Sequence, residues 1–290
     1  MKKENVICYH HNDLDGIVAA AIVKKVFQQA DLVSINYGDD FTFIRKDHNN
    51  FDIVVVVDFS FPEEIMNEMA SSHGAQFCWI DHHESAKEKL KDLWDSDKID
   101  GLRSIEKAGC ELTWDWFFPH EECPMLIQHV GDRDMWEFEL ENTKEICEAL
   151  HYSAKDPADF LEALNNLDYK NLIKTGKILL ESKDIRCKSV FKKGKKCCLR
   201  FSPDPDKKAF YDNCYLINTN TDISDSCSYA IEQGYKIAIN FSYIKDSWIV
   251  NLRSKDIDVS EIATNYGGGG HKGASGFTYE GDIFEILKEK

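Results

Sequence analysis

The 290-residue sequence contains no apolar run long enough to cross a membrane and no excess of positive charge. Its longest apolar stretch, around residues 53–57, has the length of a β-strand, whereas a membrane-spanning helix needs about 20 apolar residues. The 35 basic and 51 acidic residues give a formal net charge of −16. Proteins that track long nucleic acids present broad basic surfaces, so this balance argues against such a partner. A small anionic ligand remains compatible with it.

The cysteine pattern lacks Cys-x-x-Cys pairs and follows no zinc-ribbon or disulfide spacing, although there are ten cysteines. We therefore expect reduced thiols and a cytoplasmic protein, and we interpret Cys8, Cys78 and Cys110, which lie in apolar runs, as small core residues. The apolar segment near the N-terminus is too short for a secretory signal, so we expect none. Neither internal repeats nor low-complexity segments interrupt the sequence.

Strand-like and helix-like segments alternate along the first part of the chain. Strands are expected at residues 5–9, 32–37, 53–58 and 76–80, and helices at residues 16–29, 62–72 and 108–118. This order predicts an open α/β fold with a parallel sheet and right-handed crossovers. Ligands of such sheets bind in a crevice at the carboxyl ends of the strands.

The second half of the chain starts with a helical pattern over residues 156–188, in which Pro157 suits a helix start. Strands are then expected at residues 197–201, 215–218, 236–243 and 247–253, and helices at residues 224–232, 260–265 and near the end. We interpret the lysine-rich run 192–196 as a solvated hairpin tip. The pattern predicts a first domain at residues 1–155, connecting helices at 156–190 and a smaller mixed α/β domain at 191–290.

Four clusters of carboxylates and imidazoles recur in the first half, each expected where a strand ends. They are residues 11–16 (His-Asn-Asp-Leu-Asp-Gly), 57–60 (Val-Asp-Phe-Ser), 81–84 (Asp-His-His-Glu) and 131–134 (Gly-Asp-Arg-Asp). Carboxylates and imidazoles are ligands for divalent metals. Asp58 follows an apolar strand, where a buried carboxylate needs a cation, and it is suited to bridge two metals. Two such metals can activate a water and neutralise a phosphoryl transition state.

A second constellation is the run of four glycines at 267–270, followed by His271 and Lys272. Successive glycines expose backbone N–H groups and let an anion approach the main chain. His271 adds a hydrogen-bonding or cationic group, and Arg253 and Ser254, at the end of an expected strand, offer further phosphate contacts. The segment therefore indicates an anion-binding loop rather than a flexible linker.

The order of these motifs resembles that of the DHH phosphoesterases over nearly the whole chain, and residues 267–277 resemble the glycine-rich signature of the DHH-associated C-terminal domain. Among these enzymes the chain is most similar to the nanoRNase and oligoribonuclease type. The resemblance implies a parallel-sheet DHH domain joined by helices to the smaller domain, with substrate between them. It also implies two divalent metal ions, with manganese favoured over magnesium or cobalt.

The resemblance further implies roles for single residues. One metal would be held by His11, Asp13 and Asp58, and the other by Asp15, Asp58, His82 and Asp132. The catalytic residues would be Asp58, Asp81 and His83, with Asp81 supporting His82 from outside the metal shell. Substrate would contact Arg253, Ser254, Gly268, Gly269, Gly270 and His271. Two choices stay open: His10 competes with His11, and Asp134 competes with Asp132.

These expectations lead to a metal-dependent phosphodiesterase that hydrolyses short RNA or linear dinucleotides, in the manner of a 5′–3′ exoribonuclease. The acidic net charge favours oligonucleotides of a few residues over long nucleic acid. The alternatives are a phosphatase for nucleotide bisphosphates or pyrophosphate, a cyclic-nucleotide phosphodiesterase and a non-catalytic nucleotide-binding module. No membrane partner is expected, and a homodimer is left open.

Overall fold

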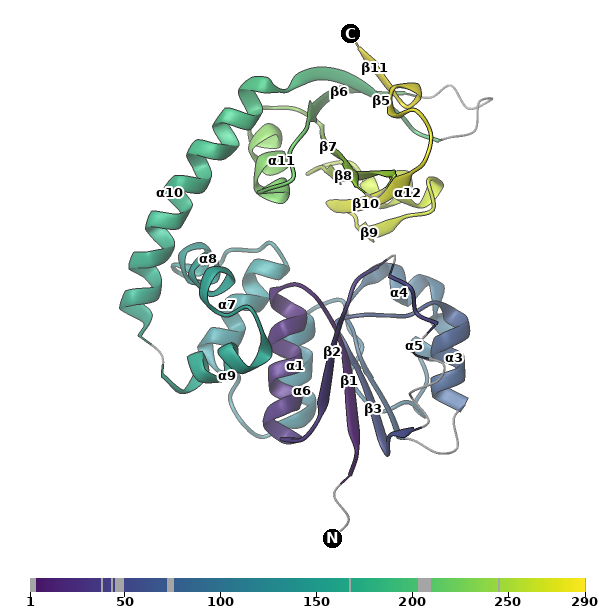
Figure 1. Cartoon of the computed structure of the whole chain (residues 1–290), viewed down its shortest axis with the longest axis vertical. Coiled ribbons are helices and arrows are strands. Elements are labelled where there is room, and N and C mark those ends of the chain that lie inside the picture. Colours follow the sequence, from purple (N-terminus) through teal and green to yellow (C-terminus); the bar gives the residue numbers. More distant parts are fainter. Residues whose placement is uncertain are drawn as a thin grey trace. The chain divides into compact units, whose positions relative to one another are not determined.

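The computed structural model of the chain describes residues 4–37, 39–42, 44, 50–71, 76–166, 168–202, 210–244 and 246–289. The chain divides into two compact units, Met1–Leu180 and Glu181–Lys290 (Figure 1). No helix among these described residues is both long enough and apolar enough to cross a bilayer. The ten cysteines are all described, and all are free thiols.

A four-stranded parallel sheet forms the centre of the first unit (Figure 1). Its strands are β1 (Val6–His11), β2 (Asp31–Ile35), β3 (Ile53–Val57) and β4 (Gln76–Ile80), in the order β2-β1-β3-β4. The chain leaves β1 for β2 on one side and then continues to β3 and β4 on the other. The predicted parallel α/β fold is thus confirmed, and the order reverses between β1 and β3, where such sheets bind ligands.

Apolar residues of the strands alternate between two cores on opposite faces of this sheet. One face, which includes Cys8 and Val55, packs against helices from the second half of the unit and against α1. These helices are α1 (Leu14–Val26), α6 (Gly109–Phe117), α7 (Met125–Asp134), α8 (Thr143–Ser153) and α9 (Pro157–Asn165). The other face, which includes Tyr9 and Trp79, is covered by α3 (Glu63–Ser71), α4 (Glu84–Lys89) and α5 (Lys91–Trp94).

An irregular segment continues the sheet beyond β4 and is fixed by one arginine. Asp100 and Arg103 form isolated parallel bridges with Cys78 and Asp81. The Arg103 guanidinium donates to the carbonyls of Trp79 at 3.0 Å and Trp94 at 2.9 Å. Because Asp81 follows directly on β4, this arginine holds the end of the strand from which the Asp-His-His cluster starts.

The fourth cluster lies on a helix and not at the end of a strand, which corrects the sequence expectation. Helix α7 was not predicted, although Leu126, Ile127 and Val130 are buried at helical spacing. Asp132 and Asp134 belong to its last turn. The acidic groups therefore reach the sheet edge from a covering helix as well as from the strands.

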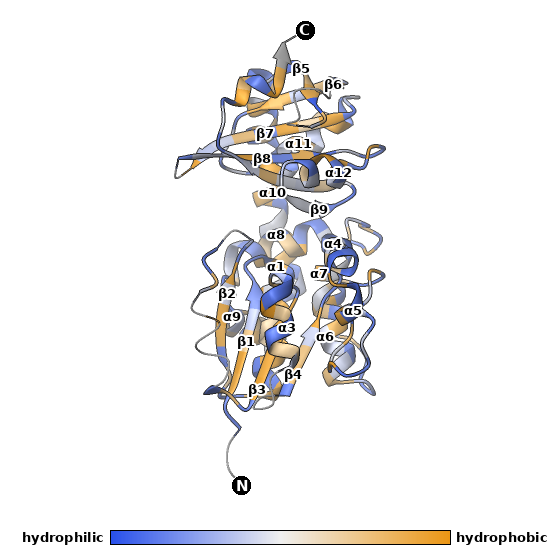
Figure 2. Ribbon diagram, turned by 90° about the vertical axis from the view of Figure 1, so that its right-hand side faces the viewer, coloured by the Kyte–Doolittle hydropathy of each residue, from blue (hydrophilic) through white to orange (hydrophobic). Residues whose placement is uncertain are grey.

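The second unit contains a seven-stranded mixed sheet in the order β11-β5-β6-β7-β8-β10-β9. Its strands are β5 (Lys195–Arg200), β6 (Phe210–Ile217), β7 (Ile237–Ile244), β8 (Ser247–Arg253), β9 (Gly269–His271), β10 (Ala274–Tyr279) and β11 (Leu287–Glu289). Only the β6–β7 pairing is parallel among the described pairs. Hydrophobic residues concentrate on the strands of both sheets (Figure 2).

Helices cover both faces of this second sheet. Helix α12 (Val259–Asn265) packs on one core, and α11 (Ile223–Glu232) packs on the other beside Val190 and Phe191 from the end of α10 (Tyr169–Lys193). The division between the units falls within α10, inside the segment predicted to connect two domains. Helix α9 packs on α1, where Phe160 is part of the first core.

Two local expectations for the second unit were wrong. The lysine-rich run is not a hairpin tip: Lys192 and Lys193 end α10, Lys195 begins β5, and Gly194 lies between them. A Cβ at Gly194 would lie 2.5 Å from the Tyr215 ring, so the chain passes tightly from helix to strand there. The helix expected near the end is a short 3-10 turn, Ile283–Glu285, followed by β11.

Candidate metal centre

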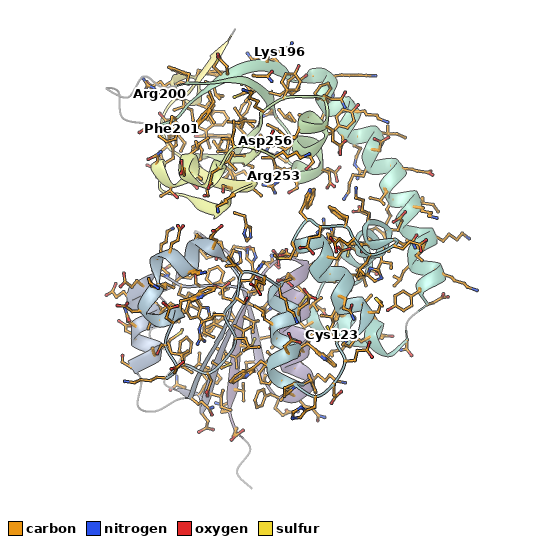
Figure 3. The ribbon with its side chains drawn as sticks, turned by 180° about the vertical axis from the view of Figure 1, so that it is seen from behind. Cys123, Lys196, Arg200, Phe201, Arg253 and Asp256 are labelled. Atoms are coloured by element: carbon orange, nitrogen blue, oxygen red, sulfur yellow. The ribbon has the colours of Figure 1, made fainter. Side chains whose placement is uncertain are left out.

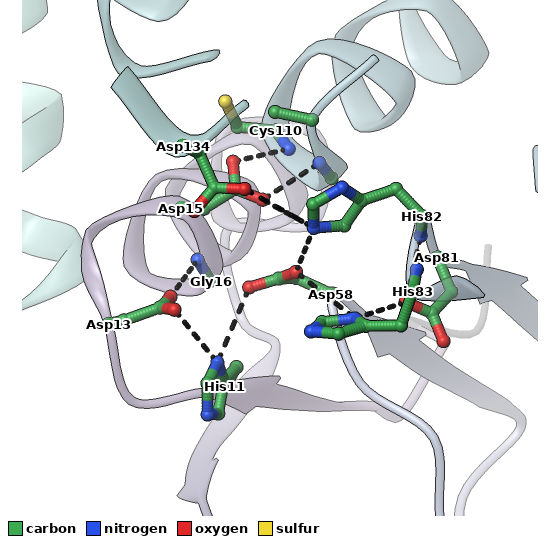
Figure 4. Close-up of polar contacts among 12 residues, drawn as sticks. His11, Asp13, Asp15, Gly16, Asp58, Asp81, His82, His83, Cys110 and Asp134 are labelled. Carbon is green, nitrogen blue, oxygen red and sulfur yellow. Dashed lines mark hydrogen bonds and ion pairs between the residues drawn. The ribbon is translucent and has the colours of Figure 1, made fainter. Parts of the chain in front are cut away.

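Asp58 lies at the centre of the acidic cluster, directly after β3 (Figure 4). It is 1% exposed, and its backbone has a φ of 52°, in the left-handed region. That conformation costs an L-residue roughly 1–2 kcal/mol, although Asp tolerates it better than most. The Asp58 amide donates to Ile80 O at 2.9 Å, which fixes the turn against the end of β4. Strained backbone that is held in place in this way is typical of functional sites.

The two carboxylate oxygens of Asp58 face different histidines. His11 Nδ1 lies 3.7 Å from Asp58 Oδ2 and 2.9 Å from Asp13 Oδ2. His82 Nε2 lies 3.2 Å from Asp58 Oδ1. Asp58 therefore joins a group on the β1 side to a group on the β4 side, as a bridging ligand would.

The β4-side group surrounds His82 with carboxylates. His82 Nε2 lies 3.4 Å from Asp134 Oδ2 and 3.8 Å from Asp15 Oδ2. Asp15 in turn accepts hydrogen bonds from the amides of Gly109 at 2.7 Å and Cys110 at 2.9 Å, at the start of α6. A Cβ at Gly109 would lie 2.8 Å from Asp58 Cβ and 2.9 Å from Asp15 Oδ2, so this position has no room for a side chain.

Asp81 orients His83. Its Oδ1 accepts hydrogen bonds from the amides of His82 at 2.8 Å and His83 at 3.2 Å, and it lies 2.8 Å from His83 Nδ1. Such a contact places the proton on Nδ1 and leaves Nε2 as the other functional atom of the ring. The resemblance implied that Asp81 supports the ring of His82. In the structure its carboxylate contacts the ring of His83 and only the backbone amide of His82.

The acidic groups repel one another in the absence of cations. Burial raises the pKa of Asp15 well above its ordinary range, and the charges of Asp58 and Asp134 raise it further. Burial likewise raises the pKa of Asp134 to about 6, against an opposing effect of His82. Burial alone would raise the pKa of Asp58, but its interactions with His11 and His82 outweigh this and hold the pKa well below its usual range. Charge is therefore concentrated on the central carboxylate.

This donor set fits two divalent cations. One group is His11, Asp13 and Asp58, and another is Asp15, His82 and Asp134; in each, one donor atom per residue lies within 4.8 Å of the others. Neither oxygen of Asp58 accepts a well-directed hydrogen bond from any described residue, although the carboxylate is buried. A buried carboxylate without such partners needs a cation, and oxygen and imidazole donors suit borderline divalent metals.

Asp132, which was expected as a ligand, has a different position. Its carboxylate accepts hydrogen bonds from the amides of Glu139 at 2.7 Å and Leu140 at 3.1 Å and from the Thr143 hydroxyl. It thereby closes the loop between α7 and α8. The structure brings Asp134 to His82 instead, which was the open alternative. Its spacing of seven residues from buried Ile127 would have placed Asp134 on the core-facing side of the helix.

Of the two adjacent histidines, His10 is a core residue and His11 belongs to the acidic cluster. The His10 ring is buried, and its Nδ1 lies 2.8 Å from the His11 carbonyl. Burial lowers the pKa of His10, as expected for a neutral core histidine. His11 is the residue that approaches Asp13, whose other oxygen accepts from the Gly16 amide and caps α1.

Arg253, which is labelled in Figure 3, and Ser254 were expected to contact substrate, but both form hydrogen bonds within the second unit. Arg253 ends β8 and donates to the Ser224 hydroxyl at 2.7 Å. The Ser254 hydroxyl donates to Lys236 O at 2.7 Å and accepts from the Ile257 amide at 3.0 Å. The structure therefore gives the Ser254 side chain a role in the turn between β8 and α12.

The glycine run is more ordered than expected. The amide of Gly268 follows the end of α12 and donates to Ala263 O at 2.8 Å, so this amide is not available to a ligand. A Cβ there would lie 2.1 Å from Gly276 O. Gly269, Gly270 and His271 form β9, which pairs with β10 and lies at the edge of the sheet. The expectation of an open loop of exposed amides is thus wrong for Gly268.

Comparison with known proteins agrees with the motif order. Residues 5–129 match the DHH family, N-terminal domain. Two curated proteins are similar over 96% of this chain: an uncharacterized protein, R106, of Acanthamoeba polyphaga mimivirus (26% identity, 68% of its length) and oligoribonuclease NrnB of Bacillus subtilis (23% identity, 74% of its length). RecJ of Thermus thermophilus in complex with Mn²⁺ has a similar fold: the TM-score is 0.52 at 14% identity, covering 96% of this chain and 50% of RecJ.

Proposed function

We propose that this chain, whose residues 5–129 match the DHH family, N-terminal domain, is a divalent-metal-dependent phosphodiesterase of short oligonucleotides or linear dinucleotides. Manganese is the metal we favour. The product class would be nucleoside monophosphates, released from the end of the substrate as by a 5′–3′ exoribonuclease.

The observation that carries this proposal is the position of Asp58 between two separate ligand groups. Its Oδ2 faces His11 and its Oδ1 faces His82. A single strained, buried carboxylate with a different group on each oxygen is the arrangement that a bridged pair of cations requires. Phosphoryl transfer is the reaction class in which paired cations neutralise both the attacking and the leaving oxygen.

The residues of the chain would act as follows. Asp13 and His11 hold one cation and Asp15, His82 and Asp134 the other, with Asp58 shared. The cations, when bound, supply charge neutralisation and a water of lowered pKa. Asp81 holds the Nδ1 proton of His83, so that His83 Nε2 hydrogen-bonds to the phosphoryl group or moves a proton there.

The substrate class rests on two further observations. NrnB of Bacillus subtilis, named an oligoribonuclease, is similar over 96% of this chain. The net charge of −16 disfavours long polyanions, which bind through many phosphate contacts to basic surfaces. A substrate of a few nucleotides needs only the cations and a few local donors.

The test uses Asp58→Asn and an exposed control on α5, Asp92→Asn. Asn adopts the left-handed conformation readily, so the first variant keeps the turn and removes the charge. We expect it to bind manganese more weakly and to lose more than about 100-fold in hydrolysis of a 5′-phosphorylated diadenylate, since even outer-shell changes cost about 10–100-fold. The control should match the wild type.

The substrate panel also contains a cyclic dinucleotide, a nucleotide 3′,5′-bisphosphate and pyrophosphate. Full activity of Asp58→Asn would refute the bridged-cation arrangement. Turnover of the bisphosphate or pyrophosphate with none of the diadenylate would refute the phosphodiesterase assignment. Tight nucleotide binding without turnover in any divalent metal would favour a non-catalytic binding module.

A further inference from the structure

The strand β2 contributes an aromatic ring where the other three strands contribute ligands. It ends at Ile35, which is paired with His11, and Tyr37 follows two residues later. The Tyr37 ring centroid lies 5.6 Å from that of His11 and 6.0 Å from that of His83. Tyr37 therefore borders the metal centre from the one strand end to which the sequence motifs assign nothing.

Tyr37 is the outermost member of an aromatic column. The Phe59 and Phe61 ring centroids are 5.1 Å apart, and Tyr37 packs on Phe59 at 4.4 Å with an interplanar angle of 30°. Phe59 is fully buried, whereas Tyr37 is 52% exposed. The column thus rests on the core at one end and presents a half-exposed ring at the other.

Several contacts fix this ring. The Asp39 amide donates to Asn36 O at 3.2 Å, and the Asn36 amide donates to the Asp39 carboxylate at 2.7 Å, which closes the turn around Tyr37. The Tyr37 ring itself packs on Phe59 and lies beside His11. A ring held in this way loses little conformational entropy when a ligand stacks on it.

An exposed tyrosine alone would carry no inference, as Tyr152 illustrates. Tyr152, near the end of α8, is 64% exposed, and its contact is with the Lys155 ammonium at 6.0 Å from the ring centroid. The aromatic contacts of the described residues do not include Tyr152. Tyr37 differs because a column of rings supports it and because it borders two histidines of the metal centre.

We propose that Tyr37 is the stacking platform for a nucleobase of the substrate, next to the phosphate held at the metal centre. The inference rests on the proposed function, because a nucleotide is the ligand that carries a planar base one ribose away from its phosphate. Stacking on an aromatic ring accepts every base, so Tyr37 would favour nucleotides over base-free phosphates without selecting a sequence.

The experiment compares binding of adenosine 5′-monophosphate with binding of ribose 5-phosphate by calorimetry in the presence of manganese. The two ligands share ribose and phosphate and differ in the base. The wild type should prefer the nucleotide, and Tyr37→Ala should reduce that preference by about 5- to 150-fold, the effect of losing one base–aromatic stack. Tyr37→Phe and Tyr37→Trp should restore it, and the matched control Tyr152→Ala should leave it unchanged.

Two results would overturn the proposal. In one, Tyr37→Ala weakens both ligands equally, which would make Tyr37 a support for His11 and His83. In the other, the wild type has no preference for the ligand with a base. The binding assay needs no turnover, so a base preference that depends on Tyr37 stands even if no dinucleotide is hydrolysed, and only the proposed function then fails.

Discussion

Asp132 and Asp134 are two residues apart, and the structure predicts opposite consequences for their substitution by Asn. Asp134 approaches the ring of His82 within the metal centre. Asp132 accepts three hydrogen bonds that close the α7–α8 loop. We expect Asp134→Asn to remove metal affinity while raising the stability of the metal-free protein. We expect Asp132→Asn to lower stability while leaving the ligand set in place.

The stability gain for Asp134→Asn follows mainly from the burial of the Asp134 charge. Burial raises the pKa of Asp134 from 3.8 to about 6, and a difference of this size corresponds to at most about 3 kcal/mol. The side chain is 26% exposed, so solvent reduces the effect. Because the folded-state pKa is the higher one, the cost of the charged carboxylate is absent below pH 4 and complete above pH 6. The metal-free variant should therefore melt above the wild type at pH 7 and equal to it near pH 4.

The loss for Asp132→Asn follows from its hydrogen bonds. Burial alone would raise the pKa of Asp132, but Thr143 and the amides of Glu139 and Leu140 outweigh this and lower it. Its contribution to stability is therefore present at neutral pH and is lost as the pH falls below 4. Hydrogen bonds to a charged group contribute about 1.5–3 kcal/mol each, and Asn keeps one acceptor, so we expect a loss of about 2 kcal/mol and a lower Tm.

The assay is thermal unfolding of the metal-free proteins between pH 4 and pH 8, followed by manganese titration in a calorimeter. The reasoning is refuted if Asp132→Asn loses manganese binding while Asp134→Asn keeps it. It is also refuted if metal-free Asp134→Asn melts below the wild type at pH 7, because the carboxylate would then stabilise the fold.

Three further outcomes are expected. Gly109→Ala should weaken manganese binding more than about tenfold in a titration, because its Cβ would meet Asp58 and Asp15; unchanged affinity would contradict the tight approach of α6. Asp81→Asn should reduce kcat about 10- to 100-fold and shift the His83 limb of the pH–rate profile to lower pH. Burial lowers the pKa of His83, and the interactions with Asp81 and Asp58 together outweigh this and raise it. A pH–rate profile that does not shift would exclude the pairing of Asp81 with His83. Manganese binding at pH 7 should release protons, because burial raises the pKa of Asp15 and metal ligands bind in their deprotonated form. The affinity for manganese should therefore rise with pH. A calorimetric binding enthalpy that is the same in buffers of different ionisation enthalpy would contradict the release of protons.

Local sequence patterns were sufficient to place a residue at the sheet edge where its position follows from the strand directly before it. The valine run of β3, buried on both faces, predicts a central parallel strand, and Asp58 directly after it must lie at the carboxyl edge. The same argument places Asp13 and Asp81 there. The choice between His10 and His11 could not be made locally, because adjacent residues on a strand point to opposite sides and the sequence does not say which side the crevice occupies.

Groups that reach the centre from covering helices required the tertiary fold. Asp134 and Gly109 approach the sheet edge only because α7 and α6 pack on the same face, and the order of helices along the chain does not give that distance. The expectation of exposed amides in the glycine run was wrong for Gly268, again because a contact between distant segments decides its position. Gly268 is required by the close approach of β10, a residue-to-residue contact that composition alone does not reveal.

The sequence by itself predicted the parallel sheet and placed Asp13, Asp58 and Asp81 at the strand ends, because strand period and strand order constrain these features directly. Only the tertiary structure showed that Asp134, and not Asp132, lies beside His82. It also placed the Asp81 carboxylate against the ring of His83 and the Tyr37 ring beside His11 and His83. Those outcomes depend on helix packing and side-chain direction, which arise from contacts between residues distant in the chain.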